Sequence, residues 1–208
     1  ETGATLETVP IPGFAPYAAA FDGRGRLWLA SEAGELAVVD RGSSPPTVTR
    51  HLLNLACYEI YGIAVTDDDA ILGSGFGCDQ VFRFEPSTES VARLPTLPST
   101  RAVAVDGDRA YVAHTDGRMS IVDPTQLAVL DTVDAWSLGL SPLESIGVAA
   151  DSVGTVWMFS THGAPNDRGV ATRIDPVTRS VLAQLPVGVG PHTQGDATGR
   201  GLPPRAGA

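Results

Sequence analysis

YAAAFDGRGRLWLAS (Tyr17–Ser31) is the stretch that decides the fold, because its pattern returns three more times along the chain. In each copy a run of small apolar residues leads into a polar turn and then into a second short strand. The copies begin at residues 17, 61, 101 and 146, which are 44, 40 and 45 residues apart. No helical stripe with a 3.6-residue period interrupts them. The three later copies are YGIAVTDDDAILGS (Tyr61–Ser74), RAVAVDGDRAYVAH (Arg101–His114) and IGVAADSVGTVWMFS (Ile146–Ser160).

Each copy continues with two more short strands, first LAVVD, VFRFEP, SIVDP or ATRIDP and then TVTRHLL, SVARLPTL, LAVLDTV or SVLAQLPV. Four strands in 40–45 residues are typical of one blade of a β-propeller. One such meander cannot bury both of its faces, whereas blades stacked around an axis can, and small first strands suit the crowded centre. We therefore predict an all-β fold, a β-propeller of four-stranded antiparallel blades. Four complete repeats are flanked by partial strands at both ends.

The repeats set the expected organisation of the chain. We place the propeller at residues 4–200, with units at about 17–55, 61–98, 101–135 and 146–187. Residues 1–3 are interpreted as the remnant of a cleaved expression-vector secretion signal, and residues 201–208 as a tail or linker. The number of blades stays open at this point. Both a closed ring of four or five blades and a portion of a larger propeller fit the repeats.

Composition excludes several classes of protein. The 208 residues are 43% hydrophobic and 18% charged, which is too apolar for a disordered chain. No apolar run approaches the roughly 18–20 residues of a membrane helix, so we expect no membrane insertion. The net charge is −10, all 14 basic residues are arginines, and an acidic surface repels phosphate backbones. We therefore expect no nucleic-acid partner.

The chain has two cysteines, Cys57 and Cys78, which are too few and too far apart for a clustered zinc site. Both are expected in loops at the same end of the second unit. We predict that they form a disulfide in an oxidising compartment; the alternative is a pair of reduced core thiols.

The segment from Pro16-Tyr17 to Trp28 resembles the "P-Y/H-x-I-x…G-x-x-W-F-T-E" unit of streptogramin (virginiamycin B) lyase-like propellers. The repeated region as a whole is similar to that bacterial family and to the NHL and YncE-like propellers. The resemblance implies a propeller fold. In the lyases it also implies a histidine base from a "P-H" strand start, and glutamates at the "W-F-T-E" strand ends that hold Mg²⁺.

This chain departs from the lyase pattern at the metal-binding positions. The glutamate positions correspond to Ser31, Ser74, His114 and Ser160, and none of these is the hard anionic ligand that Mg²⁺ prefers. Only His192, in Gly190-Pro191-His192, matches the histidine pattern. We therefore expect no catalytic residues, no metal site and no cofactor.

The repeats instead predict a binding surface on the top face, where the inner strands begin. Tyr17, Tyr61 and Arg101 occupy equivalent strand starts, so two aromatic rings would lie beside a fixed cation, which suits an anionic or planar ligand. Three histidines are expected at the same face and could bind ligand or act as acid–base groups. The predicted ligand-binding residues are Tyr17, Tyr61, Arg101, His114, His162 and His192.

We therefore predict an exported, non-catalytic β-propeller binding module that recognises a protein or small-molecule ligand on its top face. We expect such a module to be secreted, periplasmic or located at the cell surface. Two alternatives remain. One is a metal-dependent lyase or hydrolase of the streptogramin lyase type, and the other is a structural repeat scaffold within a larger surface protein.

Overall fold

The computed structural model describes residue 5 and residues 7–55, 59–96, 98–134, 144–161 and 168–189. In these residues every regular element is a β-strand, and the strands form four antiparallel sheets in which each strand pairs with its neighbour in sequence. Blade 1 consists of β1 (Pro16–Phe21), β2 (Leu27–Ser31), β3 (Glu35–Asp40) and β4 (Thr47–Leu52). Blade 2 consists of β5 (Glu59–Val65), β6 (Ile71–Phe76), β7 (Gln80–Glu85) and β8 (Ser90–Pro95). Blade 3 consists of β9 (Thr100–Asp106), β10 (Arg109–His114), β11 (Arg118–Asp123) and β12 (Ala128–Asp134). Blade 4 consists of β13 (Glu144–Ala150), β14 (Val156–Thr161), β15 (Arg168–Asp175) and β16 (Ser180–Val189).

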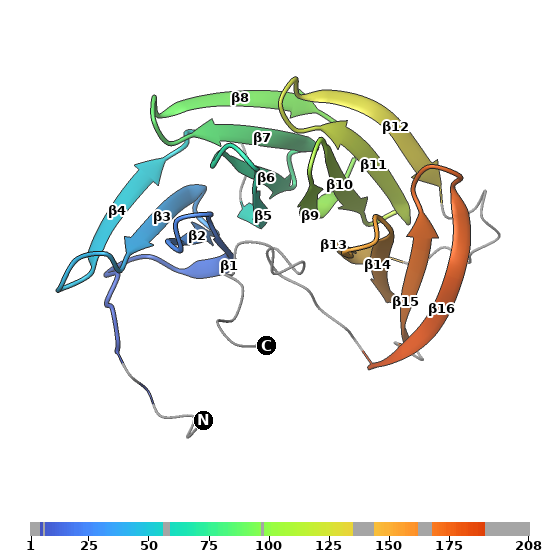
Figure 1. Ribbon diagram of the computed structural model, residues 1–208, viewed down its shortest axis with the longest axis horizontal. Coiled ribbons are helices and arrows are strands. Elements are labelled where there is room, and N and C mark those ends of the chain that lie inside the picture. Colours follow the sequence, from blue (N-terminus) through green and yellow to red (C-terminus); the bar gives the residue numbers. More distant parts are fainter. Residues whose placement is uncertain are drawn as a thin grey trace.

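The blades are arranged side by side around a common axis, with the first strand of each innermost and the fourth outermost (Figure 1). The inner strands β1, β5, β9 and β13 contact one another in that order. Their small residues allow this approach. A Cβ atom on Gly62 of β5, for example, would lie only 3.0 Å from the Cα of Ala102 in β9.

The core is divided among the spaces between neighbouring blades. One cluster joins blades 1 and 2 through Trp28, Ile63 and Phe82, and a second joins blades 2 and 3 through Leu72 and Val103. A third joins blades 3 and 4 through residues such as Tyr111 and Met158. Both faces of a middle blade are therefore buried, as radial stacking requires.

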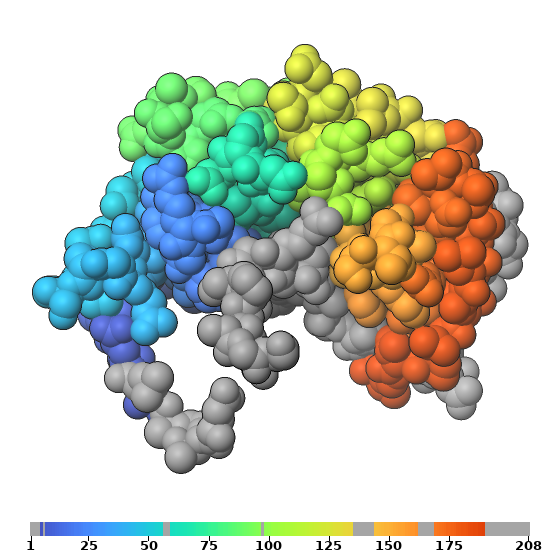
Figure 2. Space-filling view, viewed as in Figure 1, coloured from blue at the N-terminus to red at the C-terminus, as the bar shows by residue number. Residues whose placement is uncertain are grey.

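The described blades form an open arc. Blade 1 and blade 4 lie at its two ends in the ribbon and space-filling views (Figures 1 and 2). Among the described residues, no contact comparable to β1 with β5 or β9 with β13 joins blade 1 to blade 4. Within the described part of the chain, each end blade therefore has one face without a neighbouring blade.

The leading segment differs from the sequence-based expectation. Residues 5–10 resemble an outer strand, but those of them that the structure describes, 5 and 7–10, belong to no strand. A fourth strand needs the third strand of its own blade as a partner, and no described sheet offers one there. The segment instead lies against blade 1, where Val9 and Ile11 line a cavity with Phe21 and Leu29. The expected trailing strand after residue 189 lies outside the described residues.

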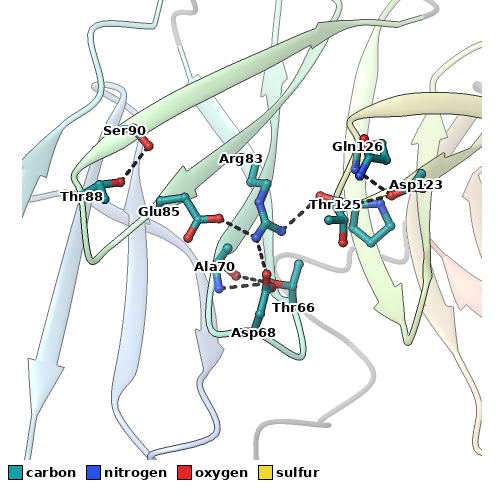
Figure 3. A network of polar contacts seen from close by, with 11 residues as sticks. Thr66, Asp68, Ala70, Arg83, Glu85, Thr88, Ser90, Asp123, Thr125 and Gln126 are labelled. Carbon is teal, nitrogen blue, oxygen red and sulfur yellow. Dashed lines mark hydrogen bonds and ion pairs between the residues drawn. The ribbon is translucent and has the colours of Figure 1, made fainter.

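Polar contacts also join the blades, and the buried Arg83 makes one of these (Figure 3). Its guanidinium binds Asp68 at 2.6 Å and Glu85 within blade 2, and it donates to the carbonyl of Pro124 in blade 3 at 3.1 Å. Burial would lower the pKa of Arg83, but the two carboxylates raise it overall. The charge is therefore retained in a contact that fixes the β11–β12 turn against blade 2.

Candidate functional site

The inner strands share a β-bulge at one position, close to where each strand begins. In β1 the pairing with β2 skips one residue between Pro16 and Ala18, and β5, β9 and β13 show the same shift. A bulge adds an unpaired residue and re-aims its side chain. The four bulge residues are Tyr17, Tyr61, Arg101 and Ile146.

Three of these four residues are the predicted ligand-binding residues Tyr17, Tyr61 and Arg101, and the structure brings them together. The rings of Tyr17 and Tyr61 meet edge to face, with their centroids 5.5 Å apart. The guanidinium carbon of Arg101 lies 5.2 Å from the centroid of Tyr61. Sequence spacing alone therefore identified a real cluster.

Two further residues, which the sequence analysis did not single out, complete the cluster. Phe76, at the end of β6, places its ring centroid 4.0 Å from the guanidinium carbon of Arg101. Glu144, at the start of β13, places a carboxylate oxygen 3.8 Å from a guanidinium nitrogen of Arg101. All four blades thus contribute to this Arg101 cluster, which consists of Tyr17, Tyr61, Phe76, Arg101 and Glu144.

Arg101 is held in place through both its backbone and its side chain. Ser74 of blade 2 donates a hydrogen bond to the Arg101 carbonyl, and the Arg101 side chain donates to the carbonyl of Thr100 at 3.3 Å. Only 12% of the Arg101 side chain is exposed, whereas that of Glu144 is 50% exposed. The cation is therefore the fixed member of this ion pair, and the carboxylate is the solvated one.

The environment fixes the protonation states of the cluster. Burial, reinforced by the neighbouring Tyr17, raises the pKa of Tyr61 to about 12 against the opposing effect of Arg101. Burial also lowers the pKa of Arg101, an effect that the nearby Tyr61 and Glu144 partly oppose. A guanidinium stays protonated under these conditions. At neutral pH Tyr61 and Arg101 are consequently a phenol and a cation, and both are hydrogen-bond donors.

His114 is not part of the surface that was predicted for it. Its side chain is completely buried. One ring nitrogen lies 2.9 Å from the hydroxyl of Ser120 and the other 3.1 Å from the carbonyl of Pro98. One nitrogen therefore binds a group of blade 3 and the other a carbonyl of the β8–β9 connection, and the expected meeting of three histidines at the top face is wrong for His114. The other two, His162 and His192, lie outside the described residues.

The strand ends compared with the lyase metal positions are also buried. The hydroxyl of Ser31 accepts hydrogen bonds from the backbone of Ala33 and Glu35, and Ser160 lies 3.1 Å from Ser145. In blade 2 the residue assigned to the metal position has to be corrected from Ser74 to Gly75. Gly75 pairs with the residue before the bulge, as Ser31 does in blade 1. These side chains stabilise turns and strands. The described residues contain no group of three or more histidine, cysteine, aspartate or glutamate side chains that could hold a metal ion.

The disulfide prediction involves one residue outside the described ranges, Cys57. Cys78 lies between β6 and β7 and is not a free cysteine. Its pairing with Cys57 stays a prediction. Within the described residues there is no helix long and apolar enough to span a bilayer.

Solved structures establish the relationship of this arrangement to known folds. Hydrazine synthase from Kuenenia stuttgartiensis matches with a TM-score of 0.71 and 15% identity, over 89% of this chain and 53% of that one. Virginiamycin B lyase from Staphylococcus aureus matches with a TM-score of 0.67 and 10% identity, over 85% of this chain and 57% of that one. The Pan2 WD40 domain from Neurospora crassa matches with a TM-score of 0.64 and 13% identity, over 83% of this chain and 50% of that one. WD40 repeats form propeller blades. The fold is a β-propeller.

These matches concern the propeller fold alone, because the identities are low. The chain spans about half the length of the three structures. No protein-family model matches the sequence, and no curated protein matches it either.

Proposed function

We propose that this chain is a non-catalytic propeller module that binds an anionic group at the Arg101 cluster. The group would be a carboxylate of a small molecule or of a protein segment. One observation carries the proposal: a nearly buried guanidinium, packed against the rings of Tyr61 and Phe76, has a carboxylate partner no closer than 3.8 Å among the described residues. A fully formed charge-assisted hydrogen bond is about 2.7–2.9 Å long.

The geometry supports exchange of one carboxylate for another. Because Glu144 is half exposed, it can move into solvent at little cost, whereas the Arg101 side chain is 12% exposed and packs against both rings. A ligand carboxylate that forms a direct hydrogen bond with Arg101 would gain electrostatic energy that Glu144 at 3.8 Å does not supply. An aromatic group beside that carboxylate would pack against Phe76, which is 36% exposed.

Binding of N-acetyl-L-phenylalanine tests the proposal, with its uncharged amide as the matched probe. The carboxylate should bind and the amide should bind at least tenfold more weakly. Arg101→Met should lower affinity for the carboxylate by roughly 10- to 100-fold, because hydrogen bonds to charged groups contribute about 1.5–3 kcal/mol. Arg179→Met, which removes an exposed arginine from the distant β15–β16 turn, is the control and should leave binding unchanged.

Glu144→Gln provides a test in the opposite direction. It removes the competing carboxylate and keeps the side-chain volume, so the probe should bind more tightly than it does to the unmodified protein. Equal binding of the acid and the amide, or unchanged binding by Arg101→Met, would contradict the proposal. Calorimetric titration of each variant gives the dissociation constants.

A location outside the cytoplasm, by secretion or in the periplasm or at the cell surface, is also part of this proposal. The predicted Cys57–Cys78 disulfide supports it, because such bonds persist in oxidising compartments. Titration of thiols in the unfolded, unreduced protein should find none, and two thiols would remove this support.

A metal-dependent lyase is the second candidate, because virginiamycin B lyase shares the fold. His162 and His192 lie outside the described residues, so they are the residues to test. Incubation with a streptogramin B substrate and excess Mg²⁺ should give no turnover if the module only binds. Turnover that is lost with a chelator and with His192→Ala would favour the lyase.

A further inference from the structure

The two ends of the open arc expose faces that are buried everywhere else in the molecule. We call the face of a blade toward the preceding blade its N-side face, and the face toward the following blade its C-side face. The strand register makes positions comparable between blades. Leu27 of blade 1 corresponds to Ile71, Ala110 and Val156, because each pairs with the inner-strand residue that lies four positions after the bulge.

The N-side face of blade 1 is incompletely covered. Phe21, Leu27 and Leu29 are partly exposed and line a cavity of about 340 Å³ with Val39 and the leading segment. The residues corresponding to Leu27 in blades 2, 3 and 4 are all completely buried. The N-side face of blade 1 thus has the composition of an interblade surface without a neighbouring blade among the described residues.

The C-side face of blade 4 shows the same property at the other end. Trp157 pairs with Ala149 as Trp28 pairs with Ala20 in blade 1. Trp28 is completely buried against blade 2 and the corresponding Tyr111 is 2% exposed, whereas Trp157 and its neighbour Phe159 are both partly exposed. Two aromatic side chains are thus presented at a surface that would be buried in a middle blade.

We propose that a second copy of this chain covers both faces. The C-side face of blade 4 in each copy packs against the N-side face of blade 1 in the other. The four described blades of each copy would then form a ring of eight, within the usual range of 4–8 blades for propellers. Because the two faces differ, each contact joins one end to the opposite end, and a twofold axis relates the two contacts.

The internal interfaces provide the evidence for complementarity. At each internal interface, the C-side face has small residues on the inner strand and one large residue on the second strand. It packs against an N-side face whose side chains are larger and mostly branched. Ala20 and Trp28 against Ile63 and Ile71 are an example. On the free faces, Ala149 and Trp157 of blade 4 correspond to Ala20 and Trp28, and Leu27 of blade 1 corresponds to Ile71, so Trp157 would meet Leu27. Ala19 of blade 1 is smaller than the corresponding Ile63, and Phe21 and Leu29 supply the other large side chains of that face.

A polar contact at the interface of blades 2 and 3 has possible partners at the two free ends. Arg83 on the C-side face of blade 2 donates to the carbonyl of Pro124, the residue after the last of the third strand in blade 3. Arg173 takes the position of Arg83 in blade 4, because it pairs with Trp157 as Arg83 pairs with Leu72. Arg41 takes the position of Pro124 in blade 1. In the closed ring Arg173 should therefore donate to the carbonyl of Arg41 in the second copy.

Sedimentation equilibrium of the full chain tests the proposal. The unmodified protein should have twice the chain mass of 21.6 kDa. Trp157→Glu places a charge on one free face and Leu29→Lys places one on the other, so each variant should be a monomer. Leu130→Glu is the control, because Leu130 is 54% exposed on the outer strand β12 and should leave the dimer intact.

Mixing the two variants distinguishes end-to-end closure from other dimers. One contact of the mixed pair is free of substitutions, and the other brings the introduced carboxylate and the introduced ammonium group together as opposite charges, so mixing should restore a dimer. A monomeric unmodified protein at all concentrations, open-ended polymers, or a Trp157→Glu variant that stays dimeric would overturn the proposal.

Hydrogen exchange of the backbone amides in β2 and β14 provides a second test. It uses the unmodified protein, so it does not depend on whether a variant folds. Protection there should increase with protein concentration, and protection that does not depend on concentration would also overturn it.

Discussion

Single carboxylates hold the turns at the end of the inner strands that lies opposite the Arg101 cluster. Asp22, which is completely buried, accepts hydrogen bonds from the backbone of Arg24 and Arg26 and from the indole of Trp28 at 3.0 Å. Asp151 performs the same role in blade 4, where it accepts from the backbone of Val153 and Thr155. Such a carboxylate fixes the turn because it satisfies several donors at once.

The titration of Asp151 should make stability depend on pH. Burial opposes ionisation, but hydrogen bonds from Thr155 and Val153 and the charge of Arg173 outweigh it and lower the pKa to about 2, from 3.8. A depressed pKa in the folded state adds stability that is complete above the unfolded-state value and is lost as the pH falls through the folded-state value. We therefore expect the free energy of unfolding in urea to fall between about pH 4 and pH 2.

Asp151→Asn tests this assignment. The variant should be less stable at neutral pH and should show a smaller loss of stability as the pH falls through this window. Asp108→Asn, on an exposed turn of blade 3, is the matched control and should retain the full loss. A pH dependence identical in Asp151→Asn and the unmodified protein would contradict the role of Asp151.

At the scale of the element, the second strand of blade 2 depends on a glycine to accommodate its neighbour. A Cβ atom on Gly73 of β6 would lie 2.2 Å from the ring of Phe82 in β7, and Phe82 is completely buried between blades 1 and 2. The ring occupies the space where other blades have a side chain on β2, β10 or β14. The absence of a side chain at Gly73 is therefore a packing requirement.

Gly73→Ala should destabilise the protein by about 1–3 kcal/mol, the usual cost of overpacking a core. Gly23→Ala in the exposed β1–β2 turn is the control, because its Cβ would meet nothing closer than 3.4 Å. In the double variant Gly73→Ala/Phe82→Leu the smaller side chain should relieve part of the clash. The costs of the two single changes, measured by urea unfolding, should then add to more than that of the double variant. Simple additivity would show that the clash is not the cause.

At the scale of the whole molecule, the net charge of −10 should make stability sensitive to salt. Like charges repel one another most in the compact state, and the screening length falls from about 30 Å at 0.01 M to about 10 Å at 0.1 M salt. We expect the melting temperature to rise over this range, with the larger part of the rise at low salt. A melting temperature that falls instead would show that the surface ion pairs, such as Arg24 with Asp69, outweigh the net repulsion.

The fold could be predicted from the sequence because each blade repeats the same alternation of apolar residues and turns. Tyr17, Tyr61 and Arg101 could be predicted as a group because they occupy one position of that repeat. Phe76 and Glu144 could not, since neither belongs to the repeated pattern and the contacts that join them to Arg101 cross between blades. His114 was misplaced for a related reason. The repeat shows where its strand ends, but not that Ser120 and Pro98 enclose the ring.

The shared bulge separates the accessible part of the Arg101 cluster from the strand pairing. Tyr17 and Arg101 occupy positions where the register of the inner strand shifts, so a substitution there leaves the strand pairing on either side intact. Tyr61 and Ile146 occupy the same position in blades 2 and 4 but are buried in the core, so they would be kept. A combinatorial library randomised at the codons of Tyr17 and Arg101, together with the exposed Phe76 and Glu144, would vary the chemistry of one surface, and selection from it could redirect the module toward cationic or neutral targets.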